Sequence, residues 1–219
     1  PEKEMSGAGS SITTKRPLFP IKIKENFIAI NGTPVDCVHL GLHQLCPFEP
    51  DLLLSGINFG ANMAEDLLYS GTVGAAMEGR EFSIPSIAIS AAAFIQPGSE
   101  GKSQPNFLTA AKIGSDIIEK LHEIKIDSKI TLNVNVPNLN YEEINRLKLT
   151  CPGSWGKRNP PRKETLNSGK DHFIALDRPP VYSREGQEAV QDHQNRSDSR
   201  DQLLTVKKAF TEQEKDPVQ

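Results

Sequence analysis

The stretch PDLLLSGINFGANMAEDLLYSGTVGAAMEGREFSIPSIAIS, from Pro50 to Ser90, decides the fold class. Asp51 to Leu54 is a short apolar run typical of a buried parallel strand. Ser55 to Ala64 is rich in glycine and asparagine and predicts a loop. A helix is expected from about Thr72 to Phe82, and Ile87 to Ser90 predicts the next strand. This strand–loop–helix–strand order indicates a parallel α/β unit.

The same stretch brings polar groups to the expected end of a strand, where open α/β sheets bind their ligands. Ser55, Asn58 and Asn62 offer neutral oxygen ligands or hydrogen-bond donors there. Ser70 stands at the capping position of the following helix, with Gly71 and Thr72 after it. A helix N-terminus presents free N–H groups and a positive dipole end, which suit a phosphate group.

Several motifs in order carry a resemblance to a known family. They are SGAGSSIT (6–13), NGTPVDCVHLGL (31–42), SGINFGAN (55–62), LYSGTVGAAMEG (68–79) and IPSIAIS (84–90). Together they resemble the SurE family (survival protein E), a group of metal-dependent nucleoside monophosphate phosphatases. The likeness runs from the first residue to about Val136 and continues more weakly to about Ser183.

The resemblance implies a divalent metal ion, Mg²⁺ or Mn²⁺, with Ser6 and Asn58 among its ligands. The family's main ligands are two adjacent aspartates in an Asn-Asp-Asp-Gly motif after its first strand, and no adjacent aspartate pair occurs in these 219 residues. We therefore expect the chain to be a fragment that lacks the first strand and helix of the full enzyme, with very weak activity on its own.

The resemblance also implies that a group of polar and small residues forms the catalytic, phosphate-side part of the site: Asn62, Ser70, Gly71 and Thr72. The implied substrate is a nucleoside monophosphate, and the implied assembly is a homodimer or homotetramer. The alternative that we keep is a catalytically inactive module that retains the fold for nucleotide binding or oligomerisation. A dinucleotide-binding oxidoreductase is disfavoured, because Gly56 and Gly60 follow a GxxxG spacing and no GxGxxG opens a helix.

The rest of the chain extends the α/β pattern. Leu18–Ile30 predicts two short strands of the kind that pair as a hairpin, and Ile130–Val136 predicts a further strand. Thr33 is expected to cap a helix over Pro34–Leu45, and Phe107–Leu121 has the spacing of an amphipathic helix. Asp36 fits a capping box rather than a catalytic role, and His39 and His43 are read as surface or partly buried histidines rather than zinc ligands.

The region after Tyr141 gives weaker signals. Cys151–Lys170 predicts a projecting hairpin or solvated loop, in preference to a base-stacking role for Trp155. A strand is expected at His172–Leu176, and one or two helical turns at Leu203–Phe210. The prediction is thus an α/β, three-layer Rossmann-like fold with a mainly parallel sheet flanked by helices. A domain over 1–186 would carry the projecting hairpin region, followed by an irregular, poorly ordered tail over 187–219.

Composition narrows the function classes. Lys+Arg 25 against Asp+Glu 28 gives a net charge of −3, so no basic field recruits polymeric nucleic acid. The 3 cysteines are irregularly spaced, which fits a reducing compartment and a cytoplasmic location. The longest apolar stretch, Ile84–Ile95, is interrupted by serines and a proline and is shorter than the roughly 20 residues of a membrane span. No membrane interaction is expected.

Overall fold

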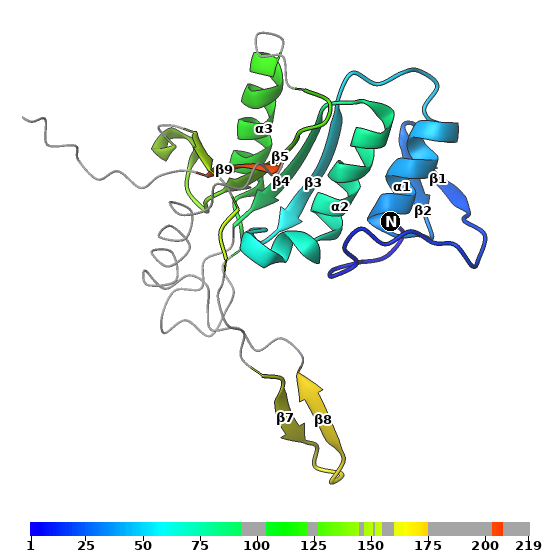
Figure 1. The fold of residues 1–219 in the computed structure, drawn as a ribbon, viewed down its shortest axis with the longest axis vertical. Coiled ribbons are helices and arrows are strands. Elements are labelled where there is room, and N and C mark those ends of the chain that lie inside the picture. Colours follow the sequence, from blue (N-terminus) through cyan, green and yellow to red (C-terminus); the bar gives the residue numbers. More distant parts are fainter. Residues whose placement is uncertain are drawn as a thin grey trace, which may run out of the picture.

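The structure is a computed structural model of residues 1–219, and it describes residues 1–92, 104–121, 127–144, 147–150, 152–154, 160–174 and 203–207. Its central element is a sheet with the strand order β3-β4-β5-β9-β6 (Figure 1). The strands are β3 (Leu53–Phe59), β4 (Ser86–Ala91), β5 (Thr131–Val136), β6 (Lys148–Thr150) and β9 (Leu203–Lys207). β3, β4, β5 and β9 pair in parallel, and β6 pairs antiparallel to β9.

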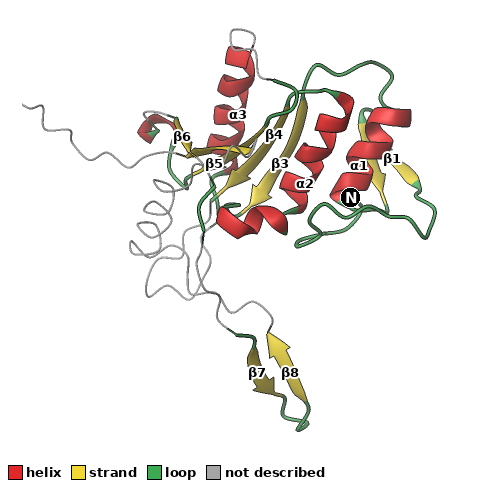
Figure 2. Cartoon of the chain, in the orientation of Figure 1, coloured by secondary structure: helices red, strands yellow, loops and turns green. Residues whose placement is uncertain are grey.

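Helices cover the sheet on both faces (Figure 2). They are α1 (Pro34–Leu40), α2 (Gly71–Glu78) and α3 (Phe107–Leu121). Shorter helical turns are η1 (Gly41–Leu45), η2 (Ala64–Leu68), η3 (Gly79–Phe82) and η4 (Tyr141–Glu143). Two separate hairpins complete the described residues: β1 (Pro20–Lys24) with β2 (Phe27–Ile30), and β7 (Arg162–Thr165) with β8 (Asp171–Ile174). The predicted three-layer α/β fold with a parallel sheet is confirmed.

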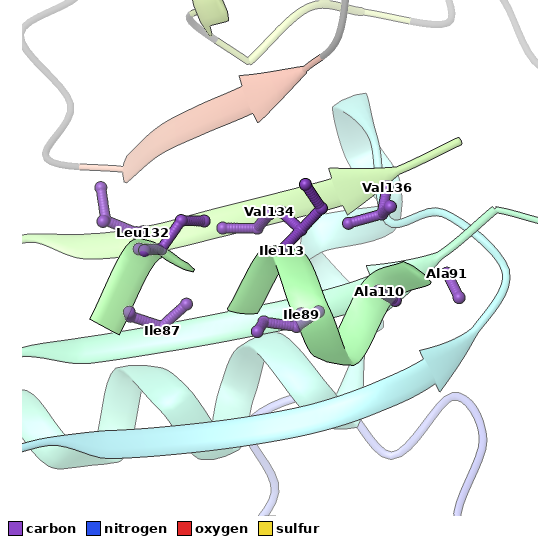
Figure 3. Close-up of a cluster of buried hydrophobic side chains, with 9 residues drawn as sticks. Ile87, Ile89, Ala91, Ala110, Ile113, Leu132, Val134 and Val136 are labelled. Carbon is purple, nitrogen blue, oxygen red and sulfur yellow. The ribbon is translucent and has the colours of Figure 1, made fainter. Parts of the chain in front are cut away.

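The alternation of side chains along β4 separates two cores, because successive residues of a strand point to opposite faces. Ile87 and Ile89 belong to a cluster that β4 forms with α3 and β5, shown in Figure 3. Ala88, between them, packs instead against Val73 and Ala76 of α2. Large apolar residues therefore fill the α3 side, while small residues allow α2 to lie close to the other face.

The predicted elements are recovered with some changed bounds. The three expected parallel strands are neighbours, the Leu18–Ile30 hairpin forms as β1 and β2, and α3 has the predicted bounds Phe107–Leu121. The Pro34–Leu45 helix is α for its first part only, since Gly41–Leu45 takes a wider π turn. The helix expected from Thr72 begins one residue earlier and ends in a tighter turn, Gly79–Phe82.

Two expectations were wrong. The loop predicted to begin at Ser55 is in fact strand up to Phe59, because Asn58 and Phe59 pair with Ser90 and Ala91 of β4. The pairing register of β3 with β4 shifts between Ser55 and Asn58, and this shift accommodates Gly56, which had suggested a loop. The helical turns expected at Leu203–Phe210 are instead the strand β9 over Leu203–Lys207, which pairs with β5. The β-branched pair Thr205 and Val206 suits such a paired strand.

The β7–β8 hairpin stands apart from the sheet in Figure 1. Its first strand lies within the hairpin or loop region predicted at Cys151–Lys170, and its second strand, Asp171–Ile174, overlaps the strand expected at His172–Leu176. Trp155 lies outside the described residues, as do most of the positions in the 187–219 tail. The division of the chain at residue 186 stays a prediction. Among the described helices, none combines the length and apolar character that a bilayer crossing requires.

Candidate functional site

The carboxyl ends of β3, β4 and β5 meet at one edge of the sheet, because these strands are parallel. Backbone hydrogen bonds continue the contact just past the strand ends. The Gly60 N–H donates to the Ala91 carbonyl at 2.8 Å, and the Ala92 N–H donates to the Val136 carbonyl at 2.8 Å. The candidate site lies at this edge, on the face that carries α2.

Asn58, near the end of β3, has a fixed amide orientation. Its Nδ2 donates to the Gly60 carbonyl at 2.8 Å and to the Phe59 carbonyl at 3.3 Å. Its Oδ1 accepts a hydrogen bond from the Thr72 hydroxyl at 3.2 Å. The amide oxygen, which is the atom predicted to bind a metal ion, therefore points toward the first turn of α2.

The N-terminus of α2 is capped as the sequence predicts. Ser70 is buried, and its hydroxyl oxygen accepts a hydrogen bond from the Val73 N–H at 3.1 Å. The Ser70 side chain is thus committed to holding the helix start, whereas the partly buried Thr72 reaches out to Asn58. A side chain at Gly71 would collide with Pro34, because its Cβ would lie 2.9 Å from the Pro34 Cγ.

The loop that carries Ser6 runs against α2. Gly9 donates its N–H to the Tyr69 carbonyl at 3.0 Å, just before the helix begins. At Gly74 the two backbones touch, since a Cβ on that residue would lie 2.6 Å from the Gly9 carbonyl oxygen. The Met5 carbonyl oxygen would lie 3.5 Å from a Cβ on Gly71, so the residue before Ser6 reaches the first turn of α2. Ser6 itself is exposed.

A buried carboxylate holds the other end of this loop. Asp36 is 1% exposed, and its two oxygens accept hydrogen bonds from the Thr13 N–H at 2.8 Å, the Thr13 hydroxyl at 2.6 Å and the Thr33 N–H at 2.8 Å. Burial alone would raise the pKa of Asp36, but these hydrogen bonds outweigh it and hold the pKa below its ordinary value. The predicted capping box is confirmed, and the contact with Thr13 is an addition that the sequence did not indicate.

Asn62 lies at the centre of a buried polar network at the ends of β4 and β5. Its N–H donates to the Asn135 Oδ1 at 2.8 Å, and its Nδ2 donates to the Ser90 hydroxyl at 2.8 Å. Its carbonyl accepts from the Nδ2 of Asn133 at 3.0 Å and from the Nδ2 of Asn135 at 2.9 Å. All four side chains are buried. Asn62 is therefore held by both its backbone and its side chain.

The sequence held a signal for this network that the motifs alone did not reveal. Asn133 and Asn135 alternate with Val134 and Val136 in a strand that is buried along its whole length. Period-two alternation places both amides on the α2 face, opposite the α3 core. Because a buried amide without partners costs free energy, two such residues in one buried strand indicate a hydrogen-bonded network.

The histidines of α1 and η1 make no metal-ligand group. The His39 Nδ1 lies 2.8 Å from the Glu78 Oε1, and the His43 ring meets Phe82 edge-on at 4.6 Å between centroids. Across the part of the chain that the structure describes, no group of three or more histidine, cysteine or acidic residues is arranged to hold a metal ion. The two residues predicted to bind a cation, Ser6 and Asn58, both carry neutral oxygens.

The predicted site residues thus come together in part. Asn58 and Thr72 are in direct contact, Ser70 and Gly71 share the first turn of α2 with Thr72, and the loop of Ser6 packs on that turn. Asn62 follows β3 but turns toward β4 and β5. A cation shared by Ser6 and Asn58 stays a prediction.

These features define a three-layer α/β protein whose candidate site lies at the carboxyl edge of a parallel sheet. A family model described as "Survival protein SurE" matches residues 1–159, and the chain belongs to the SurE family. The protein named 5'-nucleotidase SurE from Stutzerimonas stutzeri is 41% identical over 173 residues, which are 79% of this chain and 66% of that protein. The 5'-nucleotidase SurE of Pseudomonas putida is 42% identical over 177 residues, covering 80% of this chain and 68% of that protein.

A solved structure agrees with these relatives. The crystal structure of the SurE protein from Aquifex aeolicus matches with a TM-score of 0.68 and 39% identity, covering 93% of this chain and 78% of that one. The chain spans about two thirds of the length of the curated relatives, 66% and 68% of the two named above. Its family is one of nucleotidases that hydrolyse phosphate esters.

Proposed function

We propose that the chain forms the phosphate-side part of a phosphomonoesterase that hydrolyses nucleoside monophosphates to nucleoside and phosphate with the help of a divalent metal ion. The observation that carries the proposal is the contact between the Thr72 hydroxyl and the Asn58 Oδ1 at 3.2 Å. It joins an amide oxygen at a strand end to the first turn of a helix. An atom that can ligate a cation therefore lies next to a helix start that can bind an anion.

The donor atoms fit Mg²⁺ or Mn²⁺ in kind, because these ions prefer oxygen ligands. In this proposal the Asn58 Oδ1 and the Ser6 hydroxyl supply two of the ligands of the ion. When bound, such an ion neutralises phosphate charge, activates a water molecule and stabilises the leaving oxygen. Neutral oxygens alone hold a divalent ion weakly, and the adjacent aspartates implied by the family resemblance would supply the missing negative charge.

The remaining residues bind and orient the phosphate. The positive dipole end of α2 and the N–H groups of its first turn would attract the phosphate, and Gly71 leaves that turn without a side chain. Thr72 orients the Asn58 amide and offers its hydroxyl at the same place. Asn62 supports the strand end through its network with Ser90 and Asn135, so its role here is to hold the segment after Asn58 in position.

The test measures phosphate release from a nucleoside monophosphate with added Mn²⁺ or Mg²⁺. The 219-residue chain should release phosphate very slowly, and a version extended at its N-terminus by a strand ending in Asn-Asp-Asp-Gly should turn over. Two carboxylates near one ion contribute several kcal/mol at an effective dielectric of about 20, and each ~1.4 kcal/mol changes metal occupancy about tenfold.

Asn58→Ala in the extended protein should remove most of the turnover, whereas Asn167→Ala, at an exposed turn of the β7–β8 hairpin, should not. Robust metal-dependent phosphate release by the 219-residue chain would contradict the proposal that the charged metal ligands come from the added N-terminal segment. If the extended protein binds a nucleotide but never releases phosphate under any metal, the family resemblance reflects a non-catalytic binding module instead.

A further inference from the structure

Two partly exposed aromatic rings lie at the same carboxyl edge of the sheet as the candidate site, but on the face that carries α3. Phe59 is the last residue of β3, and Phe107 is the first residue of α3. Their ring centroids are 6.3 Å apart and the ring planes are tilted by 54°. They come from segments 48 positions apart in the chain (107 − 59), so the fold rather than local sequence brings them together.

The pair is not absorbed into the core. Ile57, two positions earlier on the same strand face, packs against the α3-side cluster. Phe59 and Phe107 instead stay 46% and 38% exposed. Single exposed apolar residues are ordinary, but two large rings in contact at a ligand-binding edge form a surface that suits a flat aromatic ligand.

The position of Phe107 is fixed by polar contacts at the same edge. Asn106 accepts a hydrogen bond from the Thr109 N–H at 3.0 Å, which caps the start of α3. The Asn106 N–H donates to the Asn138 Oδ1 at 2.9 Å, just after β5 ends. The first turn of α3 is therefore held at the carboxyl edge of the sheet, where Phe107 meets Phe59.

The end of β3 connects this aromatic pair to the phosphate side. Asn58 and Phe59 are consecutive residues that point to opposite faces, the first toward Thr72 of α2 and the second toward Phe107 of α3. Gly60 follows with a φ of 94°, and apart from Gly60 itself and its two chain neighbours no described atom lies within 4 Å of the place where its Cβ would be. Gly60 therefore adds no side chain at the strand end between the two faces.

We propose that Phe59 and Phe107 form the surface on which the base of a nucleotide stacks while its phosphate lies near Asn58 and Thr72. The inference rests on the proposed function, because it assigns the aromatic half of that substrate. Stacking on a ring face does not depend on base identity, so the surface favours nucleosides over phosphate esters without an aromatic base and discriminates little among bases.

The test measures binding rather than turnover. Saturation-transfer NMR on the 219-residue chain, with AMP, adenosine and ribose 5-phosphate as separate ligands, reports contact with the adenine protons and gives the affinity by titration. Phe59→Ala should weaken AMP binding about tenfold, within the range for losing one base–aromatic stack, and leave ribose 5-phosphate binding unchanged. Phe107→Ala should act in the same direction, and Phe59→Tyr should keep the adenine signal.

Phe48→Ala is the matched control, since Phe48 is 69% exposed and lies between η1 and the start of β3. Equal loss of AMP and ribose 5-phosphate binding in Phe59→Ala would overturn the inference. The absence of an adenine signal from the unaltered chain would also overturn it, and so would the loss of that signal in Trp155→Ala. A chain that binds adenosine through Phe59 but, in its extended form, never hydrolyses a phosphate ester would support the stacking surface and contradict the proposed function.

Discussion

Replacing Asp36 by asparagine should destabilise the protein substantially, although the change removes only a charge and one acceptor. One carboxylate oxygen accepts from the Thr13 N–H, and the other accepts from both the Thr13 hydroxyl and the Thr33 N–H. An asparagine can keep the first contact, but its NH₂ group then faces the Thr33 N–H, donor against donor. Thr33 is buried, so water does not replace the lost acceptor.

The expected loss follows from these contacts. A buried donor left without a partner costs about 1–3 kcal/mol, and hydrogen bonds to a charged group contribute about 1.5–3 kcal/mol each. Since asparagine retains one acceptor and the Thr13 hydroxyl can rotate, we expect a loss of about 3 kcal/mol in the free energy of unfolding. With a urea slope of about 3 kcal/mol per M, the unfolding midpoint should fall by about 1 M.

The assay is urea unfolding followed by circular dichroism, with Asp51→Asn as the control because Asp51 is exposed. A midpoint shift below about 0.3 M for Asp36→Asn, which is under about 1 kcal/mol at that slope, would refute the reasoning. The pH dependence gives a second check. The folded-state pKa of Asp36 lies below its ordinary value of 3.8, so its contribution is present above that pH and is lost as the pH falls through the folded-state pKa. The difference between the variant and the unaltered protein should therefore shrink in acid.

Two further predictions concern close packing and the buried amide network. Gly74→Ala would bring a Cβ within 2.6 Å of a backbone carbonyl oxygen and should cost about 1–3 kcal/mol in thermal unfolding. Gly41→Ala, whose Cβ would meet no atom within 4 Å outside its chain neighbours and its own helix backbone, should be neutral or slightly stabilising. Asn135→Ala leaves the buried Asn62 N–H without its acceptor and should cost about 1–3 kcal/mol in urea unfolding, while an unchanged midpoint would show that the network adds no stability.

The features that the sequence predicted well are those specified by nearby residues. The helix Phe107–Leu121 follows its amphipathic spacing, and the caps at Thr33 and Ser70 depend on residues three positions away. The parallel order of β3, β4 and β5 follows from the alternation of strands and helices. For these elements the local pattern and the final structure agree, because no distant contact competes with them.

The features that sequence reasoning missed depend on distant contacts. Thr13 and Asp36 are 23 positions apart, and Asn62 and Asn135 are 73 positions apart, so no local pattern pairs them. Asn58 was placed in a loop because glycines surround it, yet pairing with β4 keeps it in the strand. Leu203–Lys207 was expected to be helical, and its strand conformation is set by pairing with β5. In each case a tertiary partner outweighs the local propensity.

The attachment of the Ser6 loop has a mechanical consequence for the site. The loop is joined to α1 through Thr13 and Asp36 and to α2 through the contact of Gly9 with Gly74, so its position is set by the helix layer. Asn58 belongs to the sheet. The separation of Ser6 and Asn58 is therefore governed by the spacing between helix layer and sheet, which small buried side chains such as Ala76 keep narrow. A larger residue at that interface would change the geometry of the site without touching any residue in it.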